Sequence, residues 1–187
     1  PRGGAGGRAH RVGVGARAVV RCVPRDVAGS DRRRGDARGA RGLPNLVDSG
    51  WQWGGEPDTV LATVLGGRQA AMPAMGVVLG DAGVAATTAY VQSLSGQPVD
   101  PALAAAGGTH FQTLCIACHG ADGRGNPMLG APNLTDGAWL YGGDAATIAE
   151  TIGKGRMGQM PAHAALIGED RARLAAAWVL SQGLTER

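Results

Sequence analysis

Cys115-Ile116-Ala117-Cys118-His119 is the stretch of sequence that decides the fold. Two cysteines at this spacing followed directly by histidine are typical of covalent haem attachment, because both thiols can add to the vinyl groups while the imidazole binds the iron. A redox cysteine pair and half of a zinc site are the alternatives. A zinc site needs a second ligand pair. No such spacing is found among the remaining cysteine and histidines, Cys22, His10, His110 and His163. The motif therefore predicts haem c, held by Cys115, Cys118 and His119.

Working outward from the motif, the chain contains two copies of one module at an offset of 88 residues. Of the 51 positions from 44 to 94, 18 carry the same residue 88 positions later. Met72-Pro73-Ala74, for example, returns as Met160-Pro161-Ala162. We therefore expect an incomplete domain over 36–95, a linker over 96–101 and a haem domain over 102–187, preceded by a basic tail over 1–35.

Helices are expected on both sides of the haem in the second module. Apolar and small residues at four-residue spacing predict a helix over 102–115, and acidic residues followed by an apolar stripe predict another over 169–180, with a counterpart over 81–93. Small Gly107 should let the first two helices cross closely, with Phe111 and Trp178 near the contact. Alternating β-branched residues are not evident anywhere. The prediction is an all-α fold with long loops around the cofactor.

Met160 is the expected second axial ligand of the iron. It lies in a Gly-rich loop 41 residues beyond His119, is followed by Pro161 and has a Met counterpart at Met72. Met157 is the competitor, although its counterpart is Gln69. His163 ranks third, because Met75 stands at its place in the first module. Met72 is taken as a vestigial ligand of the first module.

Other residues are expected around the haem edge. Arg156, with Lys154, can hydrogen-bond a propionate, although a solvated basic loop is nearly as good an account. Trp139 and Tyr141 are expected to line the haem edge, with loop packing as the alternative. Pro132 completes the expected cofactor-binding set. No residue is expected to be catalytic.

The first module has no haem motif where the repeat requires one, since Val27 to Arg33 contain neither Cys nor His. One hypothesis is a shifted reading frame: Val20 to Asp26 can be encoded so that the adjacent frame spells Cys-x-x-Cys-His-Gly. The tail would then be a frameshift product, and the intact protein would carry two haems. The competing interpretation is a disordered basic tail on a degenerate domain that leaves one haem.

Charge is distributed unevenly along the chain. Residues 1–43 carry eleven Arg against three Asp, whereas the remainder carries seven basic and twelve acidic side chains. No apolar run reaches the length of a membrane helix, and the first residues lack the apolar stretch of a signal peptide. Because no Met begins the chain, we expect a fragment or a processed product that has lost an upstream anchor.

Residues 36–187 resemble subunit III of cbb(3)-type cytochrome c oxidase, a membrane-anchored subunit with two cytochrome c domains. The resemblance is carried by motifs from both modules: Asp36-Ala37-Arg38-Gly39, Pro44 to Asp48, Trp51 to Gly55, Gly67-Arg68, Met72 to Ala74, Ala89 to Ser95, Cys115 to His119, Pro132 to Asp136, Trp139 to Gly143, Gly155-Arg156 and Met160 to Ala162. The family's membrane helix and first Cys-x-x-Cys-His are missing.

The resemblance implies an electron carrier, not an enzyme by itself, on the periplasmic side of the bacterial inner membrane. Electrons would come from a donor cytochrome c or a quinol-cytochrome c reductase and pass to the catalytic subunit of the oxidase. The alternative is the cytochrome subunit of a periplasmic dehydrogenase. The arginine-rich tail could suggest a nucleic-acid arm, but it lacks interleaved aromatics, and no nucleic acid is expected as a partner.

Overall fold

The computed structural model describes residues 37–182, so the basic tail, its frameshift hypothesis and Cys22 lie outside the described residues. In this part of the chain helices alternate with long loops and two short strands. In chain order these are α2 (Pro57–Gly66), β1 (Arg68–Met72), α3 (Gly76–Leu94), α4 (Pro101–Leu114), α5 (Ile116–His119), α6 (Ala145–Lys154), β2 (Arg156–Met160), α7 (His163–Ile167) and α8 (Glu169–Gln182). The helices expected near both ends of the second module are confirmed as α4 and α8. The expectation of no strand is wrong.

Local signals explain where the helices begin. The Asp100 carboxylate accepts hydrogen bonds from the backbone N–H groups of Ala102 and Leu103 at the start of α4, and Pro101 occupies its first turn. Asp144 caps α6 in the same way, accepting from the N–H of Thr147. Neither α6 nor α2 was expected from the sequence. The capping Asp144 and the helix-starting Pro57 are the signals that could have indicated them.

The two strands pair antiparallel, with Arg68 opposite Met160 and Met72 opposite Arg156. Each strand follows a glycine of positive φ, Gly67 at 71° and Gly155 at 73°. A Cβ on Gly67 would overlap the carbonyl oxygen of Met160, and a Cβ on Gly155 would overlap that of Met72. The glycines therefore permit both the turn out of the helix and the close approach of the opposite strand.

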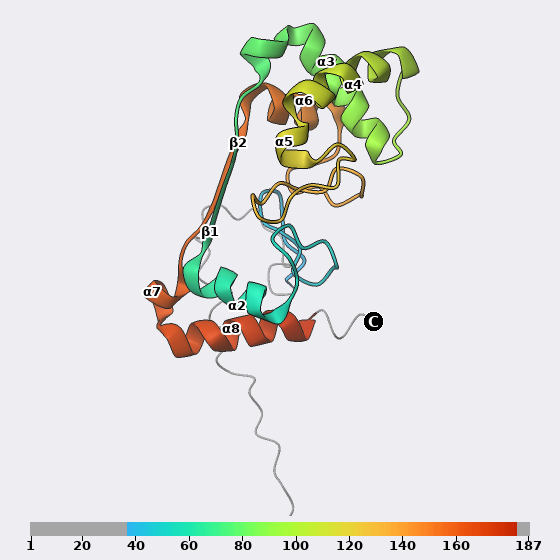
Figure 1. Cartoon of the computed structure of the whole chain (residues 1–187). Coiled ribbons are helices and arrows are strands. Elements are labelled where there is room, and N and C mark those ends of the chain that lie inside the picture. The colour runs from blue at the N-terminus through green and yellow to red at the C-terminus, as the bar shows by residue number, and fades with distance from the viewer. Residues whose placement is uncertain (1–36, 183–187) are drawn as a thin grey trace, which may run out of the picture.

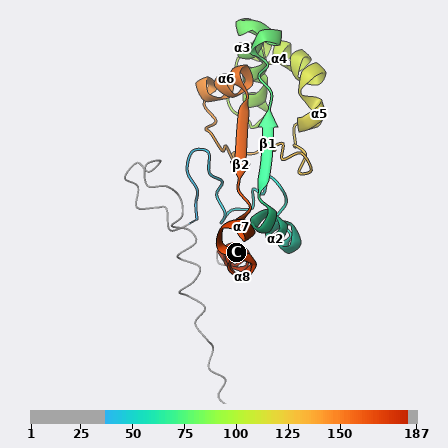
Figure 2. The ribbon, with the colours of Figure 1, turned by 90° about the vertical axis from the view of Figure 1, so that its left-hand side faces the viewer.

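The strand pair runs between two helical bodies (Figures 1 and 2). One, here called the motif body, consists of α3, α4, α5 and α6, with α3 packed on both α4 and α6. The other, the outer body, consists of α2, α7 and α8, with α8 packed on α2. Each body thus combines elements of both repeats. The C-terminal helix of each repeat packs on a helix of the other repeat.

This exchange of helices between the two repeats corrects the expected helix crossing, because α4 crosses α3 and not α8. Gly107 of α4 lies against α3, where a Cβ would overlap the carbonyl oxygen of Ala86. Phe111 is completely buried and its ring lies 5.1 Å from that of Tyr90, measured between centroids. Tyr90 is the repeat counterpart of Trp178. The expected type of close helix contact is therefore present, but the partner helix comes from the other repeat.

Two apolar cores follow the same division. The core of the motif body contains Val91, Phe111, Leu134, Ile148 and Ile152. Val64, Ala172, Ala175 and Ala176 form the core of the outer body. Small side chains dominate the second core.

Side-chain contacts repeat across the two halves of the chain. The Nε of Arg68 donates to Thr63 Oγ1 at 2.8 Å, and the Nε of Arg156 donates to Thr151 Oγ1 at 3.0 Å. Arg68 lies over the ring of Trp53, as Arg156 lies over that of Tyr141. These pairs are 88 residues apart in the sequence, so the internal repeat is also present in the local structure.

Candidate haem-binding site

The two thiols and the imidazole are placed by a continuous helical path from α4 into α5. The N–H of Cys115 donates to the carbonyl of Phe111, and the N–H of His119 donates to the carbonyl of Cys115 at 2.9 Å. Cys115 and Cys118 are three residues apart on this path and therefore lie on the same side of it. Cys115 is half-buried, Cys118 is exposed, and neither forms a disulfide.

Burial controls the protonation of this group of residues. It raises the pKa of the Cys115 thiol, with a further contribution from Cys118. It lowers the pKa of His119, an effect partly opposed by the hydrogen bond to Pro132. A neutral imidazole is the form that binds a metal, so burial favours the ligating state of His119.

The carbonyl of Pro132 determines which nitrogen of His119 can bind iron. His119 Nδ1 lies 3.2 Å from the Pro132 oxygen. Because a carbonyl only accepts, Nδ1 must carry the proton in this hydrogen bond. The Nε2 lone pair is then available for coordination, and the carbonyl fixes the ring orientation as an outer partner does in metal sites.

The loop after His119 is tied back onto the motif. The N–H of Gly125 donates to the carbonyl of His119 at 2.8 Å, and the N–H of Leu134 donates to the carbonyl of Gly123 at 2.7 Å. Met128 and Leu129 project from this loop, with 86% and 51% of their surface exposed. The loop therefore holds the backbone of His119 by a hydrogen bond and exposes the apolar side chains of Met128 and Leu129 to solvent.

Of the expected haem-edge residues, Trp139 lies with the motif. It packs against the core of the motif body, as do Cys115 and Ile116. Tyr141 instead packs on Arg156, whose guanidinium carbon lies 4.6 Å from the ring centroid. Arg156 also donates to Glu150 Oε2 at 3.3 Å, an interaction that lowers the pKa of Glu150. Arg156 is thus already engaged by protein groups, and its propionate contact stays a prediction.

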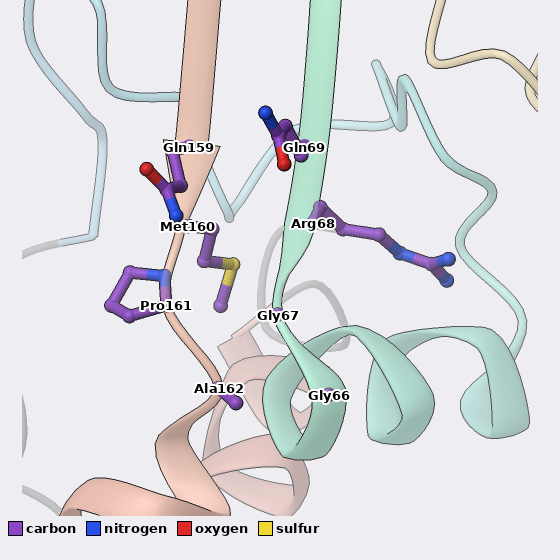
Figure 3. A pocket seen from close by; sticks show the side chains of 8 residues that line it. All are labelled: Gly66, Gly67, Arg68, Gln69, Gln159, Met160, Pro161 and Ala162. Atoms are coloured by element: carbon purple, nitrogen blue, oxygen red, sulfur yellow. The ribbon is translucent and has the colours of Figure 1, made fainter.

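Met160 lies in the other body. It packs against Val64, Ala172 and their neighbours. Figure 3 shows its side chain beside Gly67, at the end of β1 that joins α2, in a pocket of about 210 Å³ lined by Gly66 to Gln69 and Gln159 to Ala162. His163 begins α7 in the same body, and 76% of Met157 is exposed. The structure brings none of these three candidates to the core beside Cys115.

Sequence reasoning missed the contribution of the first repeat to this site. Met72 and Met75 pack against the core of the motif body, together with Tyr90 and Leu94 of α3. The identity of Met72-Pro73-Ala74 with Met160-Pro161-Ala162 was visible in the sequence. It could not indicate which module each segment serves.

Two structural observations bear on the other expectations. Between residues 37 and 182, no three His, Cys, Asp or Glu side chains lie close enough together to share a metal ion. Over the same range, no helix has the combination of length and apolar character that a bilayer crossing requires.

A Cys-x-x-Cys-His helix with unpaired thiols, a buried histidine whose pKa is lowered and a carbonyl that engages Nδ1 and leaves Nε2 available fits covalent haem. These features define a c-type cytochrome domain, a class whose cofactor is haem c. The family described as cytochrome C oxidase, cbb3-type, subunit III matches residues 102–179. This part of the chain belongs to that family, and the resemblance inferred from the sequence is confirmed.

Curated relatives extend the similarity to most of the chain. It is 42% identical over 158 residues to the cbb3-type cytochrome c oxidase subunit CcoP of Cereibacter sphaeroides, covering 79% of this chain and 54% of the relative. It is 43% identical over 158 residues, with the same coverage, to the subunit FixP of Bradyrhizobium sp. strain ORS 278. The FixP subunit of Azorhizobium caulinodans is 46% identical over 133 residues, covering 66% of this chain and 45% of the relative. The chain therefore spans about half the length of these relatives.

Proposed function

We propose that the chain holds one haem c through Cys115 and Cys118, with His119 as the proximal ligand, and carries electrons to the core of a cbb3-type oxidase. The observation that carries this proposal is the pairing of His119 Nδ1 with the Pro132 carbonyl directly after two unpaired thiols. The haem supplies a one-electron couple at its iron.

The protein groups have separate roles in this proposal. Cys115 and Cys118 would hold the haem covalently through two thioethers, whose formation by addition of S–H to the vinyl groups would consume no oxidant. The carbonyl of Pro132 holds the proton on His119 Nδ1, which would leave Nε2 available to bind the iron. Phe111 and Leu134 form part of the apolar core against which Cys115 and Trp139 pack. The burial of His119 lowers its pKa and so favours the uncharged imidazole.

The oxidase is the preferred partner because the relatives are named as subunits of cbb3-type cytochrome c oxidase. On this proposal a donor cytochrome c or a quinol-cytochrome c reductase reduces the haem on the periplasmic side, and the oxidase catalytic subunit accepts the electron. The chain itself performs no bond chemistry on a substrate. The alternative, a dehydrogenase subunit, has no support from the relatives.

Haem attachment is tested by producing the full chain with a cytochrome c maturation system and staining the denatured protein for haem. Cys115→Ser and Cys118→Ser together should abolish the covalent haem, whereas the matched control Cys22→Ser should retain it. Haem that remains bound after denaturation of the double variant would refute the attachment site.

Electron delivery is tested separately, by mixing the reduced holoprotein with a cbb3-type oxidase core in the presence of oxygen. The haem should be oxidised much faster with the core than without it. Equal rates, or copurification with a quinoprotein or flavoprotein in place of a copper-containing oxidase, would contradict the assigned partner while leaving the haem site intact.

A further inference from the structure

We propose that Gln52 and Trp53 of the first repeat, here called the loop clamp, position His119 in the haem site. They do so by holding the loop whose Pro132 carbonyl accepts the hydrogen bond from His119 Nδ1. This inference rests on the haem site proposed above and goes beyond it. Both residues act through the loop and are therefore positioning residues, not ligands.

The loop clamp meets this loop at Gly130, which is buried. The side-chain Nε2 of Gln52 donates a hydrogen bond to the Gly130 carbonyl. The indole ring of Trp53 lies so close to Gly130 that a Cβ on this glycine would overlap the ring. Gly130 also has a φ of 64°, which glycine adopts without steric cost. In Figure 1 the loop before α2 accordingly lies beside the loop that follows α5.

A short path connects the clamped glycine to the carbonyl that engages His119. Asn126 and Ala131 exchange two backbone hydrogen bonds, at 3.0 and 3.1 Å. Gly125 approaches the carbonyls of Ala131 and Pro132 so closely that a Cβ would overlap both. The N–H of Gly125 in turn donates to the His119 carbonyl at 2.8 Å. A shift of the clamped glycine is therefore transmitted over two residues to the Pro132 carbonyl.

The first repeat fixes Trp53 from its own side. The guanidinium carbon of Arg68 lies 4.9 Å from the centroid of the Trp53 ring, a distance at which a cation attracts an aromatic face. The Nε of Arg68 also donates to Thr63 Oγ1 of α2 at 2.8 Å. The indole is thus anchored to α2 of the outer body, so the loop clamp couples that body to the loop after His119.

The corresponding contact in the other direction is looser. Gly42 is the repeat counterpart of Gly130, and Tyr141 is that of Trp53. A Cβ on Gly42 would lie 3.5 Å from the Tyr141 ring, an ordinary van der Waals distance. The residue before Tyr141 is Leu140, which has no side-chain donor. The tight form of the contact is therefore made to the loop that follows the Cys-x-x-Cys-His motif.

The hydrogen bond at Nδ1 affects the electron-donating strength of the imidazole. An acceptor at the outer nitrogen of a ligating histidine raises the basicity of the ligand, and second-shell hydrogen bonding is one means by which a protein sets a haem potential. A displaced Pro132 carbonyl should make His119 a weaker donor to the iron, which favours the reduced state. Loss of the loop clamp should therefore raise the reduction potential and let the Nδ1 proton exchange faster with solvent.

The experiment compares Gln52→Leu, Trp53→Ala and Trp51→Phe in the full-length holoprotein. Gln52→Leu removes the hydrogen-bond donor and introduces the residue that the second repeat carries at this position. Trp51 is the control, because its ring lies against Gly55 of its own loop. The readouts are the reduction potential and the exchange rate of the His119 Nδ1 proton, measured by NMR in the reduced protein.

Gln52→Leu and Trp53→Ala should both raise the potential and speed proton exchange about tenfold, the factor expected for one lost hydrogen bond. Trp51→Phe should leave both at the parent values. Trp53→Phe keeps a ring beside Gly130 and should recover part of the protection from exchange. An unchanged or lower potential, or unchanged exchange, in Gln52→Leu or Trp53→Ala would overturn the proposal. Equal changes in Trp51→Phe, or no recovery in Trp53→Phe, would overturn it as well.

The haem content of the denatured protein separates this proposal from the haem site on which it rests. All four variants keep Cys115, Cys118 and His119 and should therefore retain covalent haem. Absence of haem from the parent protein would refute the attachment site. Parent-level haem with unchanged proton exchange in Gln52→Leu would refute the loop clamp alone.

Discussion

The contact between Phe111 and Tyr90 gives a quantitative test of the exchanged helices. The rings are 5.1 Å apart and tilted by 48°, within the range in which aromatic pairs interact. Such a pair contributes about 0.5–1.5 kcal/mol beyond the burial of its area. In a double-mutant cycle of Phe111→Leu and Tyr90→Leu, we therefore expect a coupling free energy of about 1 kcal/mol.

Trp178 provides the matched control because it occupies the position of Tyr90 in the other repeat. It lies on α8, whose partner is α2. Substitutions without shared contacts add to within about 0.5 kcal/mol, so Phe111→Leu and Trp178→Leu should be additive. If helices of the same repeat paired instead, Trp178 would show the coupling and Tyr90 would not.

The assay is denaturant unfolding of the holoprotein, followed by far-ultraviolet circular dichroism. The free energy of unfolding is obtained for the parent, the three single variants and the two double variants. An unchanged denaturant slope shows that each substitution acts on stability alone. A coupling of about 1 kcal/mol between Phe111 and Trp178, with none to Tyr90, would refute the reasoning.

Three further predictions follow from the same packing. Gly107→Ala should lower the free energy of unfolding by about 1–3 kcal/mol, because overpacking forces α3 and α4 apart. Gly153 has open space around it, so Gly153→Ala should not destabilise the protein. Equal effects of the two substitutions in denaturant unfolding would contradict the close crossing. Hydrogen bonds from Thr147 lower the pKa of Asp144, so its stabilising effect is present above the ordinary pKa and is lost as the pH falls through the lowered one. Asp144→Asn should therefore flatten the pH dependence of the free energy of unfolding between about pH 5 and about pH 2. An unchanged slope would contradict the cap. A fragment of residues 67–156 should attach haem and run as a monomer in size-exclusion chromatography. A fragment of residues 101–187 lacks α3 and should not attach haem. The opposite result would show that each repeat folds on itself.

The sequence was sufficient for the local parts of the site. Cys115 to His119 indicates both the haem class and a helical segment, because adjacent residues must present two thiols and an imidazole together. The start of α8 is likewise visible in the acidic pair Glu169-Asp170. Such features depend on residues within one or two turns of each other.

The pairing of distant segments could not be predicted in the same way. Phe111 requires an aromatic neighbour on a crossing helix, and both Tyr90 and Trp178 satisfy that requirement in sequence. Which of the two aromatic residues packs on Phe111 depends on whether residues 67–72 and 155–160 turn back toward their own repeat or extend as strands into the other body. Gly67 and Gly155 are compatible with either conformation, and the strand composition, with Met, Gln, Ala and Gly, shows no alternation of β-branched residues.

The exchange of segments makes the motif body a single uninterrupted length of chain, from α3 through α6. As the chain is synthesised from its N-terminus, α3 is present before α4, so the first of these cores can assemble by contacts between neighbours in sequence. The outer body must wait, because α2 is made early and its partner α8 is the last helix described. Its closure links residues more than a hundred positions apart, a separation that slows folding. We therefore expect the motif body to be ready to receive the cofactor while α2 still lacks its partner helix α8.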